Sequence, residues 1–179
     1  MNNKKILIID DEVDIANNLS AILSDENYKT SIAHNSKDAL QLLSDNIYNL
    51  IILDVWLNNS DLDGIGILKK LRENSLTPVI IISGHGNIEM AVKAIKEGAN
   101  EFIEKPFTTE RLLLSVSRSI ELYEIKSENE RLKQENIYDY KFIGESLAIN
   151  RVRNLIKKVA PTTSRVMIYG DSGTGKDIV

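Results

Sequence analysis

The stretch that decides the fold is Asn49-Leu50-Ile51-Ile52-Leu53-Asp54, an apolar run that ends abruptly in a carboxylate. A continuous apolar run of this length is typical of a strand that is buried on both faces, as in the interior of a parallel sheet. Open α/β sheets bind their ligands at the carboxyl ends of their strands. Asp54 is therefore the first candidate for a functional residue.

Three further strand-like runs also end in chemically active side chains. The runs are 4–9, 78–82 and the segment around Phe102-Ile103; the side chains that follow them are Asp10 with Asp11, Ser83, and Lys105. The ends of parallel strands share one edge of a sheet. Three acids, one hydroxyl and one lysine are therefore predicted to meet at that edge.

Strands and helices alternate along the first two thirds of the chain. Apolar residues recur at helical spacing in the segments 12–25, 36–43, 65–71, 90–95 and from 108 onward, and 28–33 is a further strand candidate. Ser36 is expected to cap its helix, and Gly98 to end the fourth helix. Five strand–helix pairs predict an α/β fold, a doubly wound parallel sheet of five strands with helices on both faces.

The composition is that of an ordinary globular protein. Of the 179 residues, 42% are hydrophobic and 27% charged, and the net charge of −4 gives no reason to expect that the whole surface binds nucleic acid. The chain has no cysteine, which excludes disulfides and thiolate metal sites and fits a reducing compartment. Since neither a signal peptide nor a membrane-spanning run is visible, we expect a cytoplasmic protein without membrane contact.

The acids and their neighbours point to phosphoryl chemistry. Asp10, Asp11 and Asp54 would repel one another unless a cation joined them, and an oxygen-only site open to water suits Mg²⁺. Lys105 adds a positive charge for a phosphoryl oxygen, and Ser83 adds a neutral hydrogen-bond donor. We therefore predict a Mg²⁺-assisted site in which Asp54 is the nucleophile. Taken singly, the first two acids could be helix caps and the lysine a surface residue, but their convergence favours the site.

A heptad pattern begins where a domain of five strand–helix pairs would end. Its a positions are Leu122, Asn129 and Asn136, its d positions Ile125 and Leu132, its g positions Glu121, Glu128 and Glu135, and its e positions Lys126 and Lys133. Asparagine at a and opposite charges at g and e are typical of a parallel dimer. The alternative is a solvated linker helix with charge pairs inside the helix, because two heptads are marginal alone. We prefer the dimer.

The last part of the chain changes character again. The segment 150–159 has the pattern of an amphipathic basic helix, which Pro161 ends, and 165–169 is predicted to be a strand. We interpret the basic helix as a packing face of a domain rather than as a nucleic-acid site. The run Gly170-Asp171-Ser172-Gly173-Thr174-Gly175-Lys176-Asp177 follows. Such glycine-rich loops cradle nucleotide phosphates with their backbone N–H groups and a lysine.

These motifs carry a resemblance to a known family. Residues 1–121 resemble the receiver domain of two-component response regulators, through the acid pair at 10 and 11, the acid at 54, Ser83 and Lys105-Pro106-Phe107. The resemblance implies the sheet order 2-1-3-4-5 and makes Asp54 the phosphoacceptor. It also implies that Asp11, Asp54 and the backbone carbonyl of Trp56 bind Mg²⁺ directly, while Asp10 acts mainly through water.

The same resemblance implies which residues change conformation and which partners the protein has. Lys105 would pair with the phosphoryl group, and a cis peptide bond would precede Pro106. Ser83 and Phe102 would form a switch pair, in which the hydroxyl moves to the phosphoryl group and the ring turns inward. A sensor histidine kinase would be the phosphoryl donor. Two copies would join through the fourth and fifth helices, through the heptads at 121–136, or through both.

The C-terminal motifs extend the resemblance to the NtrC group of sigma-54-dependent transcriptional regulators. Gly144-Glu145-Ser146 and the run 170–177 are similar to the entrance of the AAA+ domain of that group. Within the group the chain is similar to the NtrX branch, through the segments 54–57, 60–64 and 83–89; the second of these is part of a loop that is longer than in most receivers. The resemblance implies a receiver at 1–121, a helical linker at 122–140 and the first part of an AAA+ domain at 141–179.

The phosphate-binding loop is expected to be incomplete in this chain. Asp177 stands where the generic pattern has Ser or Thr, a departure that the resembled family shares. Because only three residues follow Lys176, we expect no ATP hydrolysis, and we expect ATP, sigma-54 RNA polymerase and DNA as partners only of a full-length form. The preferred function is a phosphoacceptor switch that is not itself an enzyme. The alternatives are a nucleotide-binding fragment and a dimerisation module that does not depend on phosphorylation.

Overall fold

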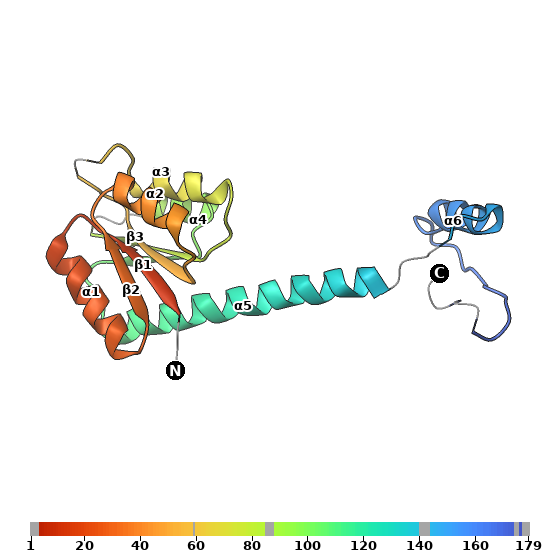
Figure 1. Ribbon diagram of the computed structural model, residues 1–179. Coiled ribbons are helices and arrows are strands. Elements are labelled where there is room, and N and C mark those ends of the chain that lie inside the picture. Colours follow the sequence, from red (N-terminus) through yellow and green to blue (C-terminus); the bar gives the residue numbers. More distant parts are fainter. Residues whose placement is uncertain (1–3, 59, 85–87, 140–143, 174–175, 177–179) are drawn as a thin grey trace. The chain divides into compact units, whose positions relative to one another are not determined.

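The computed structural model describes residues 4–58, 60–84, 88–139, 144–173 and 176, with only the backbone for 134–139 (Figure 1). The chain divides into two units, Met1–Lys126 and Ser127–Val179. Each is described by itself. The predicted positions Thr174, Gly175 and Asp177 lie outside the described residues, as do the side chains of Glu135 and Asn136.

The first unit is a parallel sheet of five strands in the order β2-β1-β3-β4-β5. The strands are β1 (Lys5–Ile9), β2 (Lys29–Ala33), β3 (Leu50–Asp54), β4 (Val79–Ser83) and β5 (Glu101–Glu104). The helices are α1 (Val13–Asp25), α2 (Ser36–Asp45), α3 (Gly64–Arg72), α4 (Ile88–Lys96) and α5 (Thr109–Asp139), the last of which continues into the second unit. The predicted fold class and strand order are confirmed.

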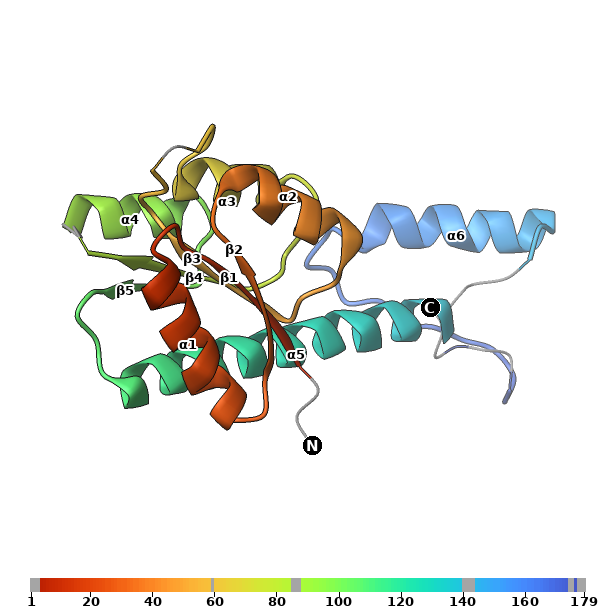
Figure 2. The same cartoon turned by 60° about the vertical axis from the view of Figure 1, so that its left-hand side comes forward.

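The central strand β3 is buried along its whole length because helices cover both faces of the sheet. Figure 2 shows α2, α3 and α4 on one face and α1 and α5 on the other. Ile51 and Leu53 belong to the core on the first side, whereas Leu50 and Ile52 belong to the core on the second. An unbroken apolar run is what a strand needs when both of its faces are covered.

The strand register sets the position of the acids. Ile9 at the end of β1 pairs with Leu53, so the next residues on the two strands, Asp10 and Asp54, lie beside each other. Asp54 in turn pairs with Ile82 of β4, one residue before Ser83. The pairing of three parallel strands therefore brings two acids and a hydroxyl to one edge of the sheet.

Two helix boundaries test the predictions directly. The cap of α2 is Asn35, whose side chain accepts a hydrogen bond from the backbone N–H of Asp38, so the prediction of Ser36 as cap is wrong. Ser36 is already the first helical residue, and its own N–H donates to the hydroxyl of Ser60 at 2.8 Å. Gly98 follows α4 with a φ of 101°, a left-handed conformation that favours glycine, and this confirms the predicted end of that helix.

The second unit contains the end of α5 and the helix α6 (Leu147–Val159), which Ser146 caps by accepting a hydrogen bond from the N–H of Ile149. No residue of α6 is buried. The predicted strand at 165–169 is wrong, because this segment is extended but pairs with no strand in the described part of the unit. A strand is defined by hydrogen bonds to a neighbour, and an apolar sequence alone does not supply them.

Candidate functional site

Asp54 is a buried carboxylate at the carboxyl end of β3, with 5% of its surface exposed. Its Oδ1 accepts a hydrogen bond from the ammonium group of Lys105 at 2.9 Å. Its Oδ2 accepts one from the backbone N–H of Trp56 at 2.6 Å. Both oxygens of the carboxylate are thus oriented by neighbours on the β3–α3 and β5–α5 loops.

The ammonium group of Lys105 lies between two buried acids. Its Nζ lies 2.9 Å from an oxygen of Asp10 and 2.9 Å from an oxygen of Asp54, and the exposed Glu12 lies 3.9 Å away. Burial alone would lower the pKa of the Lys105 ammonium, but its hydrogen bonds to the two buried acids and their charges outweigh burial and raise that pKa. The lysine therefore remains charged at neutral pH.

Burial acts in the opposite direction on the phosphoacceptor candidate. Burial raises the pKa of Asp54 above its ordinary value of 3.8, and this outweighs the hydrogen bond and the charge of Lys105, which lower it. The charge of Asp10 raises the pKa of Asp54 further, and the N–H of Trp56 lowers it. The net effect is a raised pKa, because burial disfavours the ionised form of Asp54. Lys105 is the cation that stabilises this ionised form.

Asp10 and its surroundings contain a residue to which the sequence assigned no role. One carboxylate oxygen of Asp10 faces Lys105, and the other accepts a hydrogen bond from the N–H of Glu12 at 2.9 Å. The ring nitrogen Nδ1 of His34 lies 2.9 Å from the backbone carbonyl of Asp10. The available signal was the position of His34 directly after the strand candidate 28–33, because the ends of parallel strands share one edge.

Asp11 departs from the predicted convergence of three acids. Its Oδ2 accepts hydrogen bonds from the backbone N–H of Asn58 at 3.1 Å and from the side-chain amide of Asn58 at 2.9 Å. Within the described ranges, no three acidic or histidine side chains stand close enough together to hold a metal ion as they are placed. The structure thus brings together Asp10, Asp54 and Lys105, and directs Asp11 toward the β3–α3 loop.

The chemistry of the donors nevertheless fits Mg²⁺. Asp10 and Asp54 already share one positive charge at hydrogen-bonding distance, and the candidate ligands are all oxygens. Mg²⁺ prefers oxygen ligands and keeps several waters, so two or three protein oxygens are sufficient. Direct metal binding by the Oδ2 of Asp11 would require it to give up a hydrogen bond from Asn58.

The predicted switch residues lie on the next two strands, Ser83 at the end of β4 and Phe102 within β5. Ser83 is fully buried, and its backbone carbonyl accepts a hydrogen bond from the N–H of Lys105 at 2.8 Å. Phe102 of β5 is half-buried and packs against the core on the α2–α4 side of the sheet. The peptide bond between Lys105 and Pro106 is cis, as the resemblance implied. The roles of Ser83 and Phe102 as a switch pair stay predictions.

Gly64 is a site residue that sequence reasoning missed. It is the first residue of α3, and its N–H donates to the carbonyl of Val55 at 2.9 Å. A Cβ at this position would come within 2.1 Å of the carbonyl oxygen of Asp54. Only glycine lets the helix approach the backbone of the phosphoacceptor candidate this closely. A glycine directly after the helix cap Asp63 was the available signal.

The glycine-rich loop of the second unit forms no phosphate cradle among its described residues. The ammonium group of Lys176 donates hydrogen bonds to the carbonyl oxygens of Gly170, at 2.9 Å, and of Asp171. Gly173 has a φ of 80°, in the left-handed region. The lysine that would reach a nucleotide phosphate is thus satisfied by its own loop.

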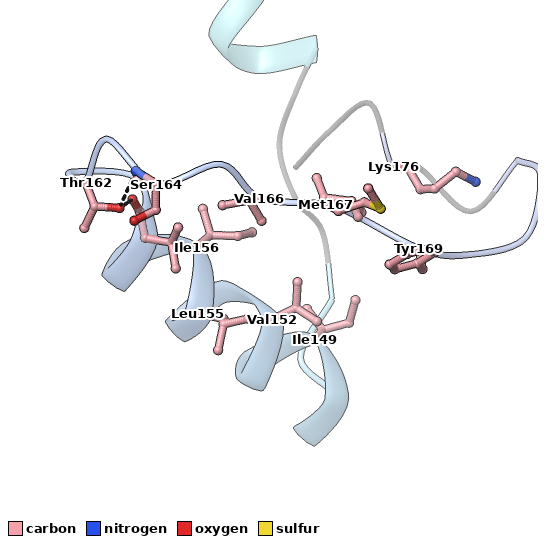
Figure 3. A pocket seen from close by; sticks show the side chains of 13 residues that line it. Ile149, Val152, Leu155, Ile156, Thr162, Ser164, Val166, Met167, Tyr169 and Lys176 are labelled. Carbon is pink, nitrogen blue, oxygen red and sulfur yellow. Dashed lines mark hydrogen bonds between the residues drawn. The ribbon is translucent and has the colours of Figure 1, made fainter.

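An apolar hollow of about 550 Å³ lies between α6 and the extended segment that follows it. Figure 3 shows Ile149, Val152 and Ile156 of the helix facing this segment, which includes Val166 and Met167. None of the residues that line the hollow belongs to the acidic edge of the first unit. It is an uncovered packing face, and its lining offers one charged side chain, Lys176.

The heptad segment of α5 has an exposed apolar stripe. Leu122, Ile125 and Leu132 expose between 47% and 59% of their surface. Glu128 pairs with Arg131 of the same helix at 2.6 Å, which is the kind of charge pair that the linker interpretation expects. Both interpretations of the segment therefore stay open in a single chain.

Comparison with family models identifies the family to which this chain belongs. Residues 6–117 match the response regulator receiver domain, and residues 142–179 match the sigma-54 interaction domain. The chain belongs to the response regulator receiver family. It is a response regulator receiver that is followed by the start of a sigma-54 interaction domain, as the motifs at both ends predicted.

Several response regulators named NtrX are similar over almost the whole chain. The nitrogen assimilation regulatory protein NtrX of Azorhizobium caulinodans is 44% identical over 97% of this chain and 38% of its own length. The crystal structure of NtrX from Brucella abortus is 45% identical, with a TM-score of 0.77 over 98% of this chain and 39% of that one; the same protein has been solved in complex with ATP. Its receiver domain alone is 47% identical, with a TM-score of 0.63 over 65% of this chain and 98% of that one.

The response regulator chain spans less than two fifths of the length of these full-length relatives. Its transcriptional activity and partners are therefore treated as proposals. In the part of the chain that the structure describes, no helix has the length and apolar character needed to cross a membrane.

Proposed function

We propose that this response regulator accepts a phosphoryl group on Asp54 from a sensor histidine kinase in the cytoplasm. The observation that carries the proposal is the buried carboxylate of Asp54, which shares the Lys105 ammonium with Asp10 at the carboxyl edge of the sheet. A buried acid with one oriented cation is what a carboxylate nucleophile for phosphoryl transfer requires.

The transfer follows from the orientation of Asp54. One of its carboxylate oxygens attacks the phosphorus of a phosphohistidine; an O–P bond forms as the N–P bond breaks, and the imidazole nitrogen keeps the electron pair. Lys105 neutralises negative charge on the phosphoryl oxygens. Asp10, Asp11, Asp54 and the carbonyl of Trp56 would hold Mg²⁺, which when bound offsets the charge of the transferring group.

Ser83 and Phe102 change conformation when Asp54 is phosphorylated. Ser83 stands one residue past the partner of Asp54 on β4, and its hydroxyl would donate to a phosphoryl oxygen. Lys105 is tied to Ser83 through the backbone, so a shift of the lysine toward the phosphoryl group is transmitted to the end of β4. The half-buried ring of Phe102 on the adjacent strand would then turn inward.

The output of the switch lies in the sigma-54 interaction domain that begins near residue 142. By similarity to NtrX, the full-length protein would regulate transcription through a complete AAA+ domain that binds ATP, sigma-54 RNA polymerase and DNA. The chain itself is proposed to be a phosphoacceptor without ATPase activity, since Lys176 is engaged by its own loop.

A homodimer is the form in which the switch would act. The exposed stripe of Leu122, Ile125 and Leu132 has the spacing of a two-stranded coiled coil. The surface of α4, where Val92 and Ile95 expose nearly half of their area, is the competing interface. Light scattering of the variants Leu132→Ser and Val92→Ser separates the two, because only the variant in the true interface reduces the dimer.

Phosphorylation with acetyl phosphate and Mg²⁺, followed by mass spectrometry, tests the proposed function. We expect one phosphoryl group per chain on the protein and none on the variant Asp54→Asn. The exposed Asp45 at the end of α2 provides a matched control, and the variant Asp45→Asn is expected to react like the parent chain. Unchanged phosphorylation of Asp54→Asn would contradict the proposal.

A further inference from the structure

One asparagine of the loop between β3 and α3, Asn58, contacts Asp11 at the acidic edge. Asn58 donates two hydrogen bonds to one atom, the Oδ2 of Asp11, from its backbone N–H at 3.1 Å and from its side-chain amide at 2.9 Å. The other two acids of the edge contact the Lys105 ammonium. Asp11 is therefore held by the loop and not by the cation that the other acids share.

This contact has a consequence for metal binding. A carboxylate oxygen has about two lone-pair directions, so two donors on Oδ2 leave that atom little capacity for a metal ion. As the described side chains are placed, the acids form no group that could hold a metal. Mg²⁺ binding through this oxygen of Asp11 would thus require it to exchange the amide of Asn58 for the metal.

We propose that Asn58 is a positioning residue that competes with Mg²⁺ for Asp11 and thereby weakens metal binding at the site. This inference rests on the proposed function of the acidic edge. The side chain of Asn58 contributes one hydrogen bond to a charged acceptor, and that bond must be lost when Asp11 turns toward the metal. The competition makes occupancy of the site sensitive to the conformation of an exposed loop.

A second contact of the same loop makes the competition testable. The hydroxyl of Ser60 accepts a hydrogen bond from the N–H of Ser36 at the start of α2, at 2.8 Å. The loop is thereby anchored two residues beyond Asn58, and the backbone N–H of Asn58 remains in a variant that lacks the side-chain amide. Truncating the side chain therefore removes the competing donor and leaves the loop in place.

The test is a Mg²⁺ titration of the full chain followed by tryptophan fluorescence. Trp56 is the only tryptophan and lies between Asp54 and Asn58 in the sequence, so its emission reports on the site. We expect Asn58→Ala to bind Mg²⁺ about fivefold more tightly than the parent chain, the factor that corresponds to about 1 kcal/mol for one net hydrogen bond. Asn46→Ala is the matched control, because Asn46 is an exposed asparagine at the opposite end of α2 from the site; its affinity should be unchanged.

A double-mutant cycle shows whether Asn58 acts through Asp11. In the background Asp11→Asn, the substitution Asn58→Ala should no longer change the Mg²⁺ affinity, because the acceptor of the competing bond is gone. In the parent chain, the side-chain amide resonances of Asn58 should shift during the titration in a nitrogen–proton spectrum, whereas those of Asn46 should not. This measurement needs no variant and covers the case in which a substitution perturbs folding.

Three results would overturn the inference. Weaker Mg²⁺ binding by Asn58→Ala would mean that the amide orients Asp11 for the metal, as outer-shell partners commonly do. An equal affinity, or an effect that persists without Asp11, would mean that the contact does not govern metal binding. These outcomes leave the proposed function intact, whereas a parent chain that binds no Mg²⁺ would remove the metal site and this inference together.

Discussion

The helices α1 and α6 each have 13 residues and an amphipathic sequence, but they differ in what they bury. In the first unit, α1 places Ala16, Leu19 and Leu23 against the sheet, where almost none of their surface is exposed. In the second unit, Leu147 and Leu155 of α6 expose 81% and 64% of theirs. The apolar face of an amphipathic helix needs a partner surface, and among the described residues only the first unit buries such a face. The buried acid of the candidate site lies in that unit.

The largest expected contrast comes from truncating one leucine in each unit. Leu53→Ala should lower the free energy of unfolding by about 3 to 5 kcal/mol, because Leu53 is fully buried in the central strand. Leu155→Ala should change it by less than about 0.5 kcal/mol, because its side chain is already exposed. Urea denaturation followed by circular dichroism measures both. Equal losses would show that α6 is packed in solution and would break the contrast between the units.

A smaller effect is expected where a helix meets the backbone of the site. Gly64→Ala should destabilise the first unit by about 2 to 3 kcal/mol, because the added methyl group would overlap the carbonyl of Asp54. Gly173→Ala in the second unit is the comparison, since a Cβ there meets no atom within 4 Å and its cost is limited to the strain of a φ of 80°. Thermal unfolding measures both variants. A Gly64→Ala protein as stable as the parent would contradict the close approach of α3.

The buried charge of Asp54 makes the stability of the first unit depend on pH. Burial raises the pKa of Asp54 in the folded state, so the folded protein binds this proton more tightly than the unfolded chain does. Its contribution to stability is therefore present below the ordinary value of 3.8 and is lost as the pH rises through the raised pKa. At neutral pH the variant Asp54→Asn should be more stable than the parent chain.

This stability gain should shrink as the pH falls toward 3.8, where the carboxyl of the parent chain is also neutral. Thermal unfolding of both proteins between pH 4 and pH 7 measures the difference. The exposed Asp45 serves again as control, and Asp45→Asn should show no such trend. A gain that is independent of pH would exclude the buried charge as its cause.

The smallest effect concerns how far the first unit extends along α5. Lys4 pairs with Glu124 at 2.8 Å, beyond the end of the receiver match at residue 117. Because about half of the Glu124 side chain is exposed, Lys4→Ala should cost less than about 0.5 kcal/mol. Hydrogen exchange at the amides near residue 124 should nevertheless become faster in the variant. Unchanged exchange would place the effective end of the unit before this pair.

The sequence predicted the features that depend on local pattern. The apolar run at 50–53 and the similar runs around it were sufficient to predict the strands, because a strand that is buried on both faces has a continuous apolar sequence. Asp10, Asp54 and Lys105 were predicted to meet because parallel strands end at one edge, and the structure brings them together.

The features that sequence missed depend on contacts between distant segments. The turn of Asp11 toward Asn58 joins residues 47 positions apart, and no periodicity records such a contact. The same holds for Gly64, whose need for glycine arises from the backbone of Asp54. The prediction of a strand at 165–169 was wrong for the converse reason. Its apolar pattern was present, but no strand among the described residues pairs with it.

The lysine bridge also constrains when a newly made chain can respond to a signal. Lys105 contacts acids that lie 95 and 51 residues earlier in the sequence. During synthesis, the acids leave the ribosome before the lysine that orients them, and β5 must join the sheet before the bridge can close. Under the proposed function, a growing chain would have no competent acceptor, and a kinase would act only on molecules that have finished folding this unit. The phosphoryl group would then report on the folded state of the protein as well as on the stimulus.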